Sequence, residues 1–483
     1  MVVEMRADYI FSGATLVDGS GGGGGVADVA VRGDRVVDIG SLGSVPDASV
    51  IDARGLVLAP GFIDSHTHDD GYLLAHPDMT PKVSQGITTV VTGNCGISLA
   101  PLVRDQVPQP LDLLGPVELF RFATFGAWLD ALRARPAAVN VVPLLGHTTL
   151  RVAVMSDLDR PASPSEREAM REIVREALEA GAFGISTGTF YPPAAAATTE
   201  EIIDVCEPIR RRGGIYATHL RDEADHIVPA MQEALQIGRH TNTRVVFSHH
   251  KLAGQRNHGR SRETLAMISE AARHQPVCLD CHPYPATSTM LRLDRVRIAS
   301  RTMITWSKGY PQAQGRDFSD LMQEFGTTPQ QTLERLSPAG AIYFLMDEND
   351  VERIFQHPLT MVGSDGLPFD THPHPRQWGT FTKVLKSMVR ERRLLSLETA
   401  IHRMTGLASQ QYGLPERGLI KKGYYADLVL FDPASVGDCA TFEKPVQISQ
   451  GVRGVWVNGA KVWDGSLATG DRPGRVLRPV QAD

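Results

Sequence analysis

The chain has 483 residues, of which 42% are hydrophobic and 22% charged, and these proportions exclude a disordered or membrane-embedded protein. Its length exceeds the ~250–300 residues that one hydrophobic core usually serves, so we expect a large domain beside a smaller one. The net charge of -6 and the lack of a basic stripe argue against nucleic acid as a partner.

The first residues show no export signal, because no apolar run with a small-residue cleavage site follows a charged start. No stretch approaches the roughly 18 continuous apolar residues of a membrane span. We therefore expect a cytoplasmic protein without a membrane partner, and the oligomeric state stays open. The odd number of cysteines, scattered at Cys95, Cys206, Cys278, Cys281 and Cys439, does not indicate a disulfide framework.

Both ends of the chain carry short strand patterns. We predict strands at residues 9–16, 26–31, 35–39, 50–51 and 56–58, and again at 427–431 and 454–462. Five consecutive glycines at 21–25 form a loop that lacks the features of a phosphate cradle. Residues 1–59 and 414–483 are therefore predicted to pair into one small β-domain.

Residues 60–413 alternate short apolar runs with helical stretches, among them 166–180, 224–239 and 262–273. Such alternation is typical of an α/β fold with parallel strands, either an open sheet or a barrel. Residues from about 290 to 342 interrupt the pattern and look like an insertion. In barrels, loops of this kind help to form the substrate pocket.

The apolar run at 57–63 leads into His66 and His68. Alternation along a strand places both imidazoles on the same side, where they can bind one divalent metal ion. The alternative is a pair of surface or capping histidines. The next apolar run, 86–92, leads to Cys95 between small residues; a thiolate is a good zinc ligand, although a cysteine judged alone is more often buried and inert.

Two further apolar runs end in histidine, at His219 and at His249. Pleat alternation puts His249 and Lys251 on one face and His250 on the other, so we assign His249 to the metal and His250 to packing or support. The run at 359–363 leads to Asp365, our candidate for the general base beside a metal-bound water. Without the other ligands, the same Ser-Asp-Gly sequence would indicate only a turn.

Together these segments resemble the amidohydrolase superfamily and, within it, the D-aminoacylases, or N-acyl-D-amino-acid deacylases. The matching segments are PGFIDSHTHDD at 60–70, TTVVTGNCGIS at 88–98, STGTFYPP at 186–193, ATHLRDE at 217–223, SHHK at 248–251 and GSDGLP at 363–368. The resemblance implies a distorted (β/α)8 TIM barrel with a small β-sandwich from both termini, and the hydrolysis of N-acyl-D-amino acids to a D-amino acid and a carboxylate.

For the metal, the resemblance implies one tightly bound Zn2+, and it leaves open whether a second, weaker one is needed. Cys95 and His219 are the implied firm ligands, and His66, His68 and His249 form a looser set. Relatives in the superfamily commonly carry a bridging lysine or glutamate on the fourth barrel strand, but residues 184–187 offer neither. Cys95 is therefore the expected bridging ligand.

For the substrate carboxylate, the resemblance implies Tyr191, Lys251, Ser288, Arg295 and Arg376, each of which could otherwise be an ordinary surface charge or turn hydroxyl. The segment around Tyr191 is similar to enzymes that accept apolar D-amino acids. We therefore expect apolar substrates, with N-acyl-D-glutamate or N-acyl-D-aspartate as the alternative.

Three rival interpretations remain. The GNCG segment and the missing bridging lysine argue against a cyclic-amide hydrolase of the hydantoinase kind. A non-catalytic relative would tend to have lost ligands, whereas every expected ligand is present in this sequence. Cys278-x-x-Cys281-His282 imitates a haem attachment motif, which a coincidental pair of cysteines explains better. His282 also stands where relatives commonly carry tyrosine.

Overall fold

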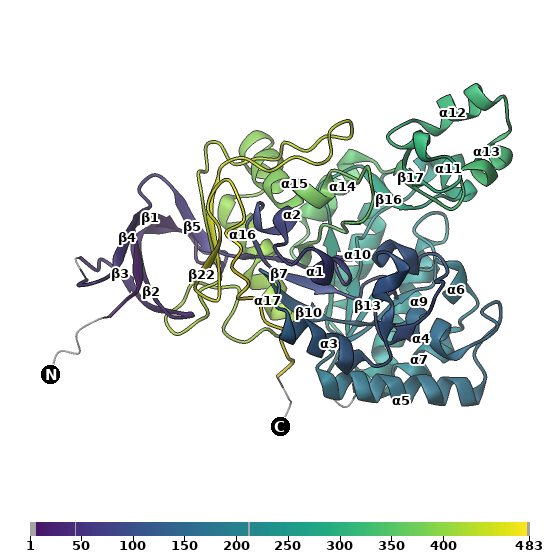
Figure 1. Ribbon diagram of the computed structural model, residues 1–483, viewed down its shortest axis with the longest axis horizontal. Helices are drawn as coiled ribbons and strands as arrows, with labels where there is room; N and C mark the ends of the chain where they lie inside the picture. Colours follow the sequence, from purple (N-terminus) through teal and green to yellow (C-terminus); the bar gives the residue numbers. More distant parts are fainter. Residues whose placement is uncertain (1–5, 44, 211–212, 481–483) are drawn as a thin grey trace.

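The computed structural model describes residues 6–43, 45–210 and 213–480. Figure 1 shows a strand-rich unit at one end, a central body of strands and helices, and a smaller helix-bearing projection that holds α12 and α13. The first five residues, which contributed to the expectation of a missing export signal, lie outside the described ranges.

Strands from both chain ends form one sheet. They are β1 (Tyr9–Leu16), β2 (Gly25–Arg32), β3 (Arg35–Gly40), β4 (Ser49–Asp52), β5 (Val57–Pro60), β20 (Leu428–Phe431), β21 (Val452–Val457) and β22 (Ala460–Trp463). Their order is β22-β21-β20-β5-β1-β2-β3, and β4 also pairs with β1. The sheet therefore forks at β1, and one apolar cluster that includes Phe11, Leu428 and Trp456 joins its parts.

Parallel strands build the central barrel: β6 (Phe62–Asp64), β7 (Ile87–Thr92), β10 (Asn140–Pro143), β11 (Leu145–Gly146), β12 (Gly184–Gly188), β13 (Ile215–His219), β14 (Arg244–Phe247), β15 (Val277–Cys281) and β19 (Thr360–Val362). They pair as β6-β7-β10 and β11-β12-β13-β14-β15-β19, so the third strand is divided into β10 and β11. The Ser65 N–H donates to Val362 O at 3.2 Å, and a bridge joins Thr67 to Gly366, which closes the barrel between β6 and β19.

Helices cover the barrel: α1 (Tyr72–Ala75), α2 (Thr80–Val83), α3 (Phe125–Ala134), α4 (His147–Val154), α5 (Pro164–Ala180), α6 (Pro192–Ala195), α7 (Thr199–Val205), α8 (Glu207–Arg210), α9 (Ile227–Thr241), α10 (Ser261–Ala271), α14 (Glu348–Gln356), α15 (Arg376–Lys383), the π-helix η5 (Val384–Glu391), α16 (Leu397–Met404) and α17 (Gly406–Tyr412). The sequence predicted α5, α9 and α10 to within three residues at each end. Helix α5 begins at a capping box formed by Ser163 and Glu166, which satisfies free N–H groups of its first turn.

The barrel interior is apolar below the strand ends. Ile63, Val91, Val142, Ile215 and Val246 come from different strands and pack in one cluster, together with Tyr412 of α17. This packed floor leaves the carboxyl ends of the strands as the place for polar side chains.

The predicted insertion is a small unit between β15 and α14. It contains β16 (Ala286–Met290), α11 (Leu293–Ile298), β17 (Arg301–Ser307), η4 (Pro311–Ala313), α12 (Phe318–Phe325), α13 (Pro329–Leu336) and β18 (Ala339–Phe344). Strands β16 and β17 both pair antiparallel with β18. The insertion therefore starts and ends slightly outside the predicted range of 290–342, because β16 and β18 begin and close it.

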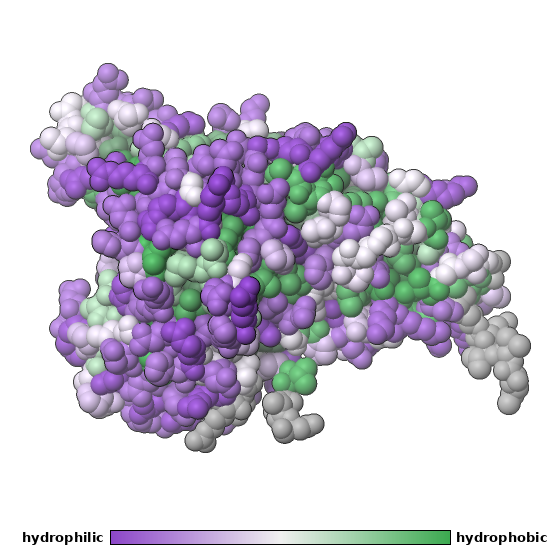
Figure 2. Space-filling view, turned by 180° about the vertical axis from the view of Figure 1, so that it is seen from behind, coloured by the Kyte–Doolittle hydropathy of each residue, from purple (hydrophilic) through white to green (hydrophobic). Residues whose placement is uncertain are grey.

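The C-terminal tail returns to the barrel. Val476 forms a bridge with Val141 of β10, and the Leu477 N–H donates to Val141 O at 2.9 Å. On the face in Figure 2, hydrophilic residues predominate, and hydrophobic ones are most numerous toward the terminal sheet. Among the described residues, no helix combines the length and the apolar composition needed to cross a bilayer.

Gly184 allows the close pairing of β12 and β13. A Cβ atom at this position would lie 2.0 Å from Ile215 O, a backbone atom that cannot move without disturbing the pairing. We expect Gly184→Ala to lower the free energy of unfolding by about 1–3 kcal/mol, as overpacking does. Urea denaturation measures the loss; Gly25→Ala, where a Cβ meets open space, is the control and should change little.

Candidate metal centre

Six side chains that the sequence assigned to metal chemistry gather at the carboxyl ends of the barrel strands. They are His66 and His68 after β6, Cys95 after β7, His219 at the end of β13, His249 after β14, and Asp365 after β19. None of them is more than 5% exposed. Parallel pairing brings them together, because all strands of such a barrel end at the same rim.

The potential ligand atoms form two overlapping groups. One contains His66, His68, Cys95 and Asp365, the other Cys95, His219 and His249, and within each group the ligand atoms lie within 4.8 Å of one another. Cys95 Sγ lies 3.3 Å from His66 Nε2 and 3.2 Å from His249 Nε2. Cys95 thus belongs to both groups, the position that the predicted bridging ligand requires.

The protonation states of these groups fit a divalent metal ion. Burial lowers the pKa of His66 to about 3, so its imidazole is neutral and can act as a ligand. Both ring nitrogens of His219 lack a hydrogen-bond partner among the described residues. Burial raises the pKa of the Cys95 thiol, an effect that a bound cation opposes. Nitrogen, sulfur and carboxylate donors together suit zinc.

Three of the six residues adopt a backbone conformation that non-glycine residues rarely take. The φ angles are 53° at Cys95, 37° at His249 and 51° at Asp365. Such conformations persist where the surrounding structure holds them, and they cluster at functional sites. At Cys95, strand β12 lies directly against the backbone: a Cβ atom on Gly188 at the end of β12 would lie 2.0 Å from Cys95 O.

Arg376 lies against Asp365. Its guanidinium is fully buried, with Nη1 2.8 Å from Asp365 Oδ2 and 3.2 Å from His282 Nε2. Burial alone would raise the pKa of Asp365, but Arg376 and then His249 lower it well below its usual range, so the carboxylate is ionised. Arg376 is not among the described residues that line the cavity beside the metal centre; its predicted contact with substrate stays a prediction.

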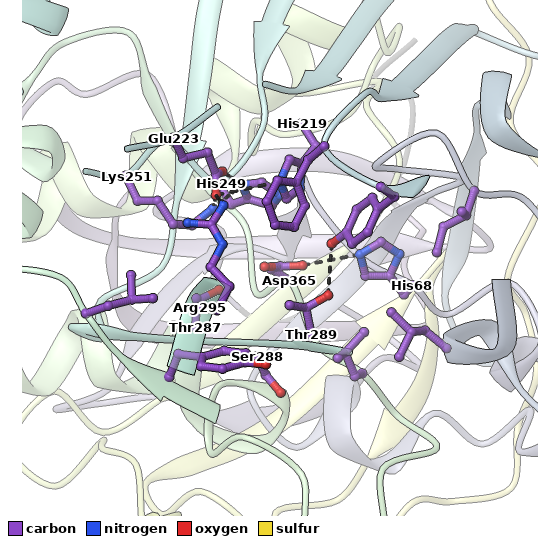
Figure 3. Close-up of a pocket in the computed structure, with 17 residues that line it drawn as sticks. His68, His219, Glu223, His249, Lys251, Thr287, Ser288, Thr289, Arg295 and Asp365 are labelled. Carbon is purple, nitrogen blue, oxygen red and sulfur yellow. Dashed lines mark hydrogen bonds and ion pairs between the residues drawn. The ribbon is translucent and has the colours of Figure 1, made fainter. Parts of the chain in front are cut away.

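The other four expected substrate-binding residues line that cavity: Tyr191, Lys251, Ser288 and Arg295. Figure 3 shows Arg295 extending toward Lys251 and Glu223, with Asp365 and His68 across the cavity. The Ser288 hydroxyl donates to Ala341 O at 3.2 Å. The insertion thus supplies part of the cavity wall.

Sequence reasoning gave no role to Glu223, a buried carboxylate of the cavity wall. Its Oε1 lies 2.6 Å from Lys251 Nζ and 3.2 Å from His249 Nδ1. Burial opposes ionisation, but His219 and Lys251 lower the pKa of Glu223 well below its usual range. Since His249 Nε2 faces Cys95, its other nitrogen faces this carboxylate, the arrangement that orients metal-binding histidines. The only sequence signal was its place in the loop that follows His219.

Asp280 also contacts two residues of the centre. Its carboxylate accepts the backbone N–H of His249 at 2.7 Å and lies 3.3 Å from His66 Nδ1.

The neighbouring Cys278 and Cys281 are buried free thiols, and His282 Nε2 lies 3.2 Å from Arg376 Nη1. This leaves the haem interpretation without support. His250 Nε2 lies 2.9 Å from Thr264 Oγ1, away from the metal groups, as expected for a supporting residue.

Comparison with known proteins places these features in context. The model of the amidohydrolase family matches residues 49–214 and 230–463. The chain is 73% identical over 478 residues to N-acyl-D-aspartate deacylase of Alcaligenes xylosoxydans xylosoxydans, covering 99% of this chain and 96% of that one. The crystal structure of D-aminoacylase shares 56% identity with a TM-score of 0.97, covering 98% of this chain and 100% of that one.

A second solved structure is N-acyl-D-glutamate deacylase from Bordetella bronchiseptica, complexed with zinc and a phosphonate inhibitor. It shares 44% identity with a TM-score of 0.94, covering 98% of this chain and 100% of that one. Nearly the whole chain thus matches these enzymes.

The contacts of Glu223 predict a role in metal affinity. We expect Glu223→Gln to weaken zinc binding by about 10–100-fold, because His249 loses its charged partner. Competition with a chelator measures the affinity. The control is Glu233→Gln, which removes a carboxylate that pairs with Arg221 outside the centre; an equal loss in both variants would contradict the assignment.

Proposed function

This chain belongs to the amidohydrolase family, and on that premise we propose that it is a zinc-dependent hydrolase of N-acyl-D-amino acids. The products are a D-amino acid and a carboxylate. One observation carries the proposal: beside a cavity whose wall contains Lys251 and Arg295, six side chains meet at a buried rim, namely His66, His68, Cys95, His219, His249 and Asp365. The full-length similarity to three deacylases of N-acyl-D-amino acids supports the same reaction and the D configuration.

The two overlapping groups of ligands would hold one or two zinc ions, with Cys95 shared between them. Bound zinc supplies a Lewis acid and makes hydroxide available near neutral pH. Cys95 and His219 are the proposed firm ligands. His66, His68 and His249 form the second set.

Asp365 is the proposed general base. Its Oδ1 lies 3.2 Å from His68 Nε2, and its Oδ2 is held by Arg376. The ionised carboxylate can take a proton from the attacking water and then deliver it to the amide nitrogen as the carbon–nitrogen bond breaks. Arg376 keeps the carboxylate ionised and fixes its orientation.

Lys251 and Arg295 are the proposed partners of the substrate's carboxylates. Both line the cavity, and Glu223 lies 2.6 Å from Lys251 but 3.9 Å from Arg295. The charge of Lys251 is thus compensated by Glu223 at a shorter distance than the charge of Arg295. The Arg295 guanidinium also lies over the Phe190 ring at 4.2 Å, which limits its freedom. A planar, oriented guanidinium suits a second carboxylate on the substrate.

For the substrate side chain, we propose D-aspartate. The expectation of apolar side chains rested on the segment around Tyr191, whose hydroxyl lies 3.0 Å from Thr289 Oγ1 and is therefore already partnered. Two cations in the cavity wall, and the 73% identity to an N-acyl-D-aspartate deacylase, favour an acidic substrate. The apolar preference remains the competing prediction.

Removal of Asp365 tests the catalytic assignment. We expect Asp365→Ala to remain folded and to lower turnover by about 10²–10⁴-fold, the usual contribution of a general base. Release of free amine from N-acetyl-D-amino acids measures turnover. Asp105→Ala, at an exposed position outside the centre, is the control. Near-normal turnover in Asp365→Ala would show that the base lies elsewhere.

The substrate assignment is tested with N-acetyl derivatives of D-aspartate, D-glutamate, D-methionine and D-leucine and with their L forms. We expect the highest kcat/KM for N-acetyl-D-aspartate. Arg295→Met should lower that value by roughly 10–100-fold, the contribution of a charged hydrogen bond, and affect N-acetyl-D-methionine less. Arg292 also lies over the Phe190 ring but does not line the cavity, so Arg292→Met is the matched control. A higher kcat/KM for D-methionine or D-leucine would favour the apolar preference.

A further inference from the structure

We infer that Lys82, a buried cation behind the metal centre, is a positioning residue that holds His66 and His68 in place relative to Asp365. Lys82 lies on α2, its side chain is fully buried, and it does not line the cavity. The effect on turnover rests on the proposed function. The effect on geometry does not.

The Lys82 ammonium contacts three buried oxygens. Its Nζ lies 2.9 Å from Asp64 Oδ2, 3.2 Å from Asp69 Oδ2 and 3.0 Å from Ser364 Oγ. All three partner residues are fully buried. Asp64 and Ser364 accept hydrogen bonds from two of the three N–H donors of the ammonium, and Asp69 adds an ion pair without a hydrogen bond.

Each partner is a near neighbour of a residue of the metal centre. Asp64 precedes His66 by two residues, Asp69 directly follows His68, and Ser364 directly precedes Asp365. Lys82 is therefore joined to both sides of the point where the barrel closes. Cys95, His219 and His249 come from other strands and make no contact with Lys82.

Few backbone contacts close the barrel at this point, and side chains add to them. Beyond the single bridge between Thr67 and Gly366, β6 and β19 share no strand pairing in the described part of the chain. Two backbone hydrogen bonds cross this point, from the Ser65 N–H to Val362 O at 3.2 Å and from the Asp365 N–H to His66 O at 2.8 Å. A side chain adds a third, because Asp64 Oδ1 accepts the Ser364 N–H at 2.7 Å. Lys82 holds the other oxygen of Asp64 and the hydroxyl of Ser364, which fixes both partners of this contact.

Stability alone is a poor reason for such a cluster. Buried ion pairs are often no more stabilising than apolar residues of the same volume, because the charges lose their hydration. Removal of the Lys82 ammonium leaves the negative charges of Asp64 and Asp69 without a positive partner. It also removes the link between Asp64 and Ser364. The ends of β6 and β19 should then separate, which moves His66 and His68 relative to Asp365.

The test compares Lys82→Met with the parent protein in the absence of metal. In a crystal structure of the variant, we expect the separation of His68 Nε2 from Asp365 Oδ1, 3.2 Å in the parent, to widen by roughly 1 Å. The distance from Cys95 Sγ to His249 Nε2, 3.2 Å in the parent, should stay the same. An unchanged His68–Asp365 separation, or an equal change in both distances, would overturn the inference.

Zinc titration of the metal-free proteins gives a second readout. We expect Lys82→Met to weaken the zinc step of the set that contains His66 and His68 by at least about tenfold, and to leave the step assigned to Cys95 and His219 unchanged. If the parent binds a single zinc, kcat should fall with KM nearly constant. Normal zinc binding together with normal kcat would contradict the inference.

Two further variants separate positioning from general stability. Arg417 is another buried cation, paired with Asp427 and Asn458 next to the terminal sheet. Arg417→Met should lower the Tm without altering zinc binding or the His68–Asp365 separation. If Lys82→Met does not fold, the double variant Lys82→Met/Asp69→Asn removes one of the opposing carboxylates, and the same distances decide the outcome.

Discussion

Parallel hydrogen bonding between the barrel strands is the constraint on which the site depends. It brings the ends of β6, β7, β13, β14 and β19 to one rim, although the residues that follow them are separated by up to about three hundred positions in sequence. The apolar floor beneath them excludes water, so each polar side chain at the rim needs a partner within the protein. The candidate metal ligands, the candidate base and the charged residues that contact them therefore lie close together at this rim.

Charge compensation in this layer follows a regular pattern. Asp365 is paired with Arg376, Glu223 with Lys251, and Asp64 with Lys82. In each pair, the carboxylate belongs to the candidate metal centre or contacts one of its histidines, and the cation binds that carboxylate. Because an unpaired buried charge is costly, each pair restricts the position of the proposed catalytic or metal-binding group beside it. Electrostatic neutralisation and geometric precision are thus provided by the same residues.

The sequence predicted the fold and the grouping of the candidate ligands better than the residues that surround and support them. Apolar strands that lead into His66, Cys95, His219 and His249 carry a local signal, so their meeting at a barrel rim could be anticipated. The position of Arg376 behind Asp365 and the positive φ angles had no such signal, because they arise from packing between distant segments. The division of the third strand into β10 and β11, and the forked terminal sheet, likewise follow from tertiary contacts.

The terminal sheet has a consequence for how the polypeptide is made. Strand β5 pairs with β20, which lies more than 350 residues later in the chain, and the tail reaches back to β10. During synthesis, the edge of β5 is exposed until almost the entire chain has left the ribosome. Such nonlocal pairing slows folding and leaves a strand edge open to other chains. The nascent chain should therefore depend on chaperones during elongation, even though the barrel of the folded protein is closed.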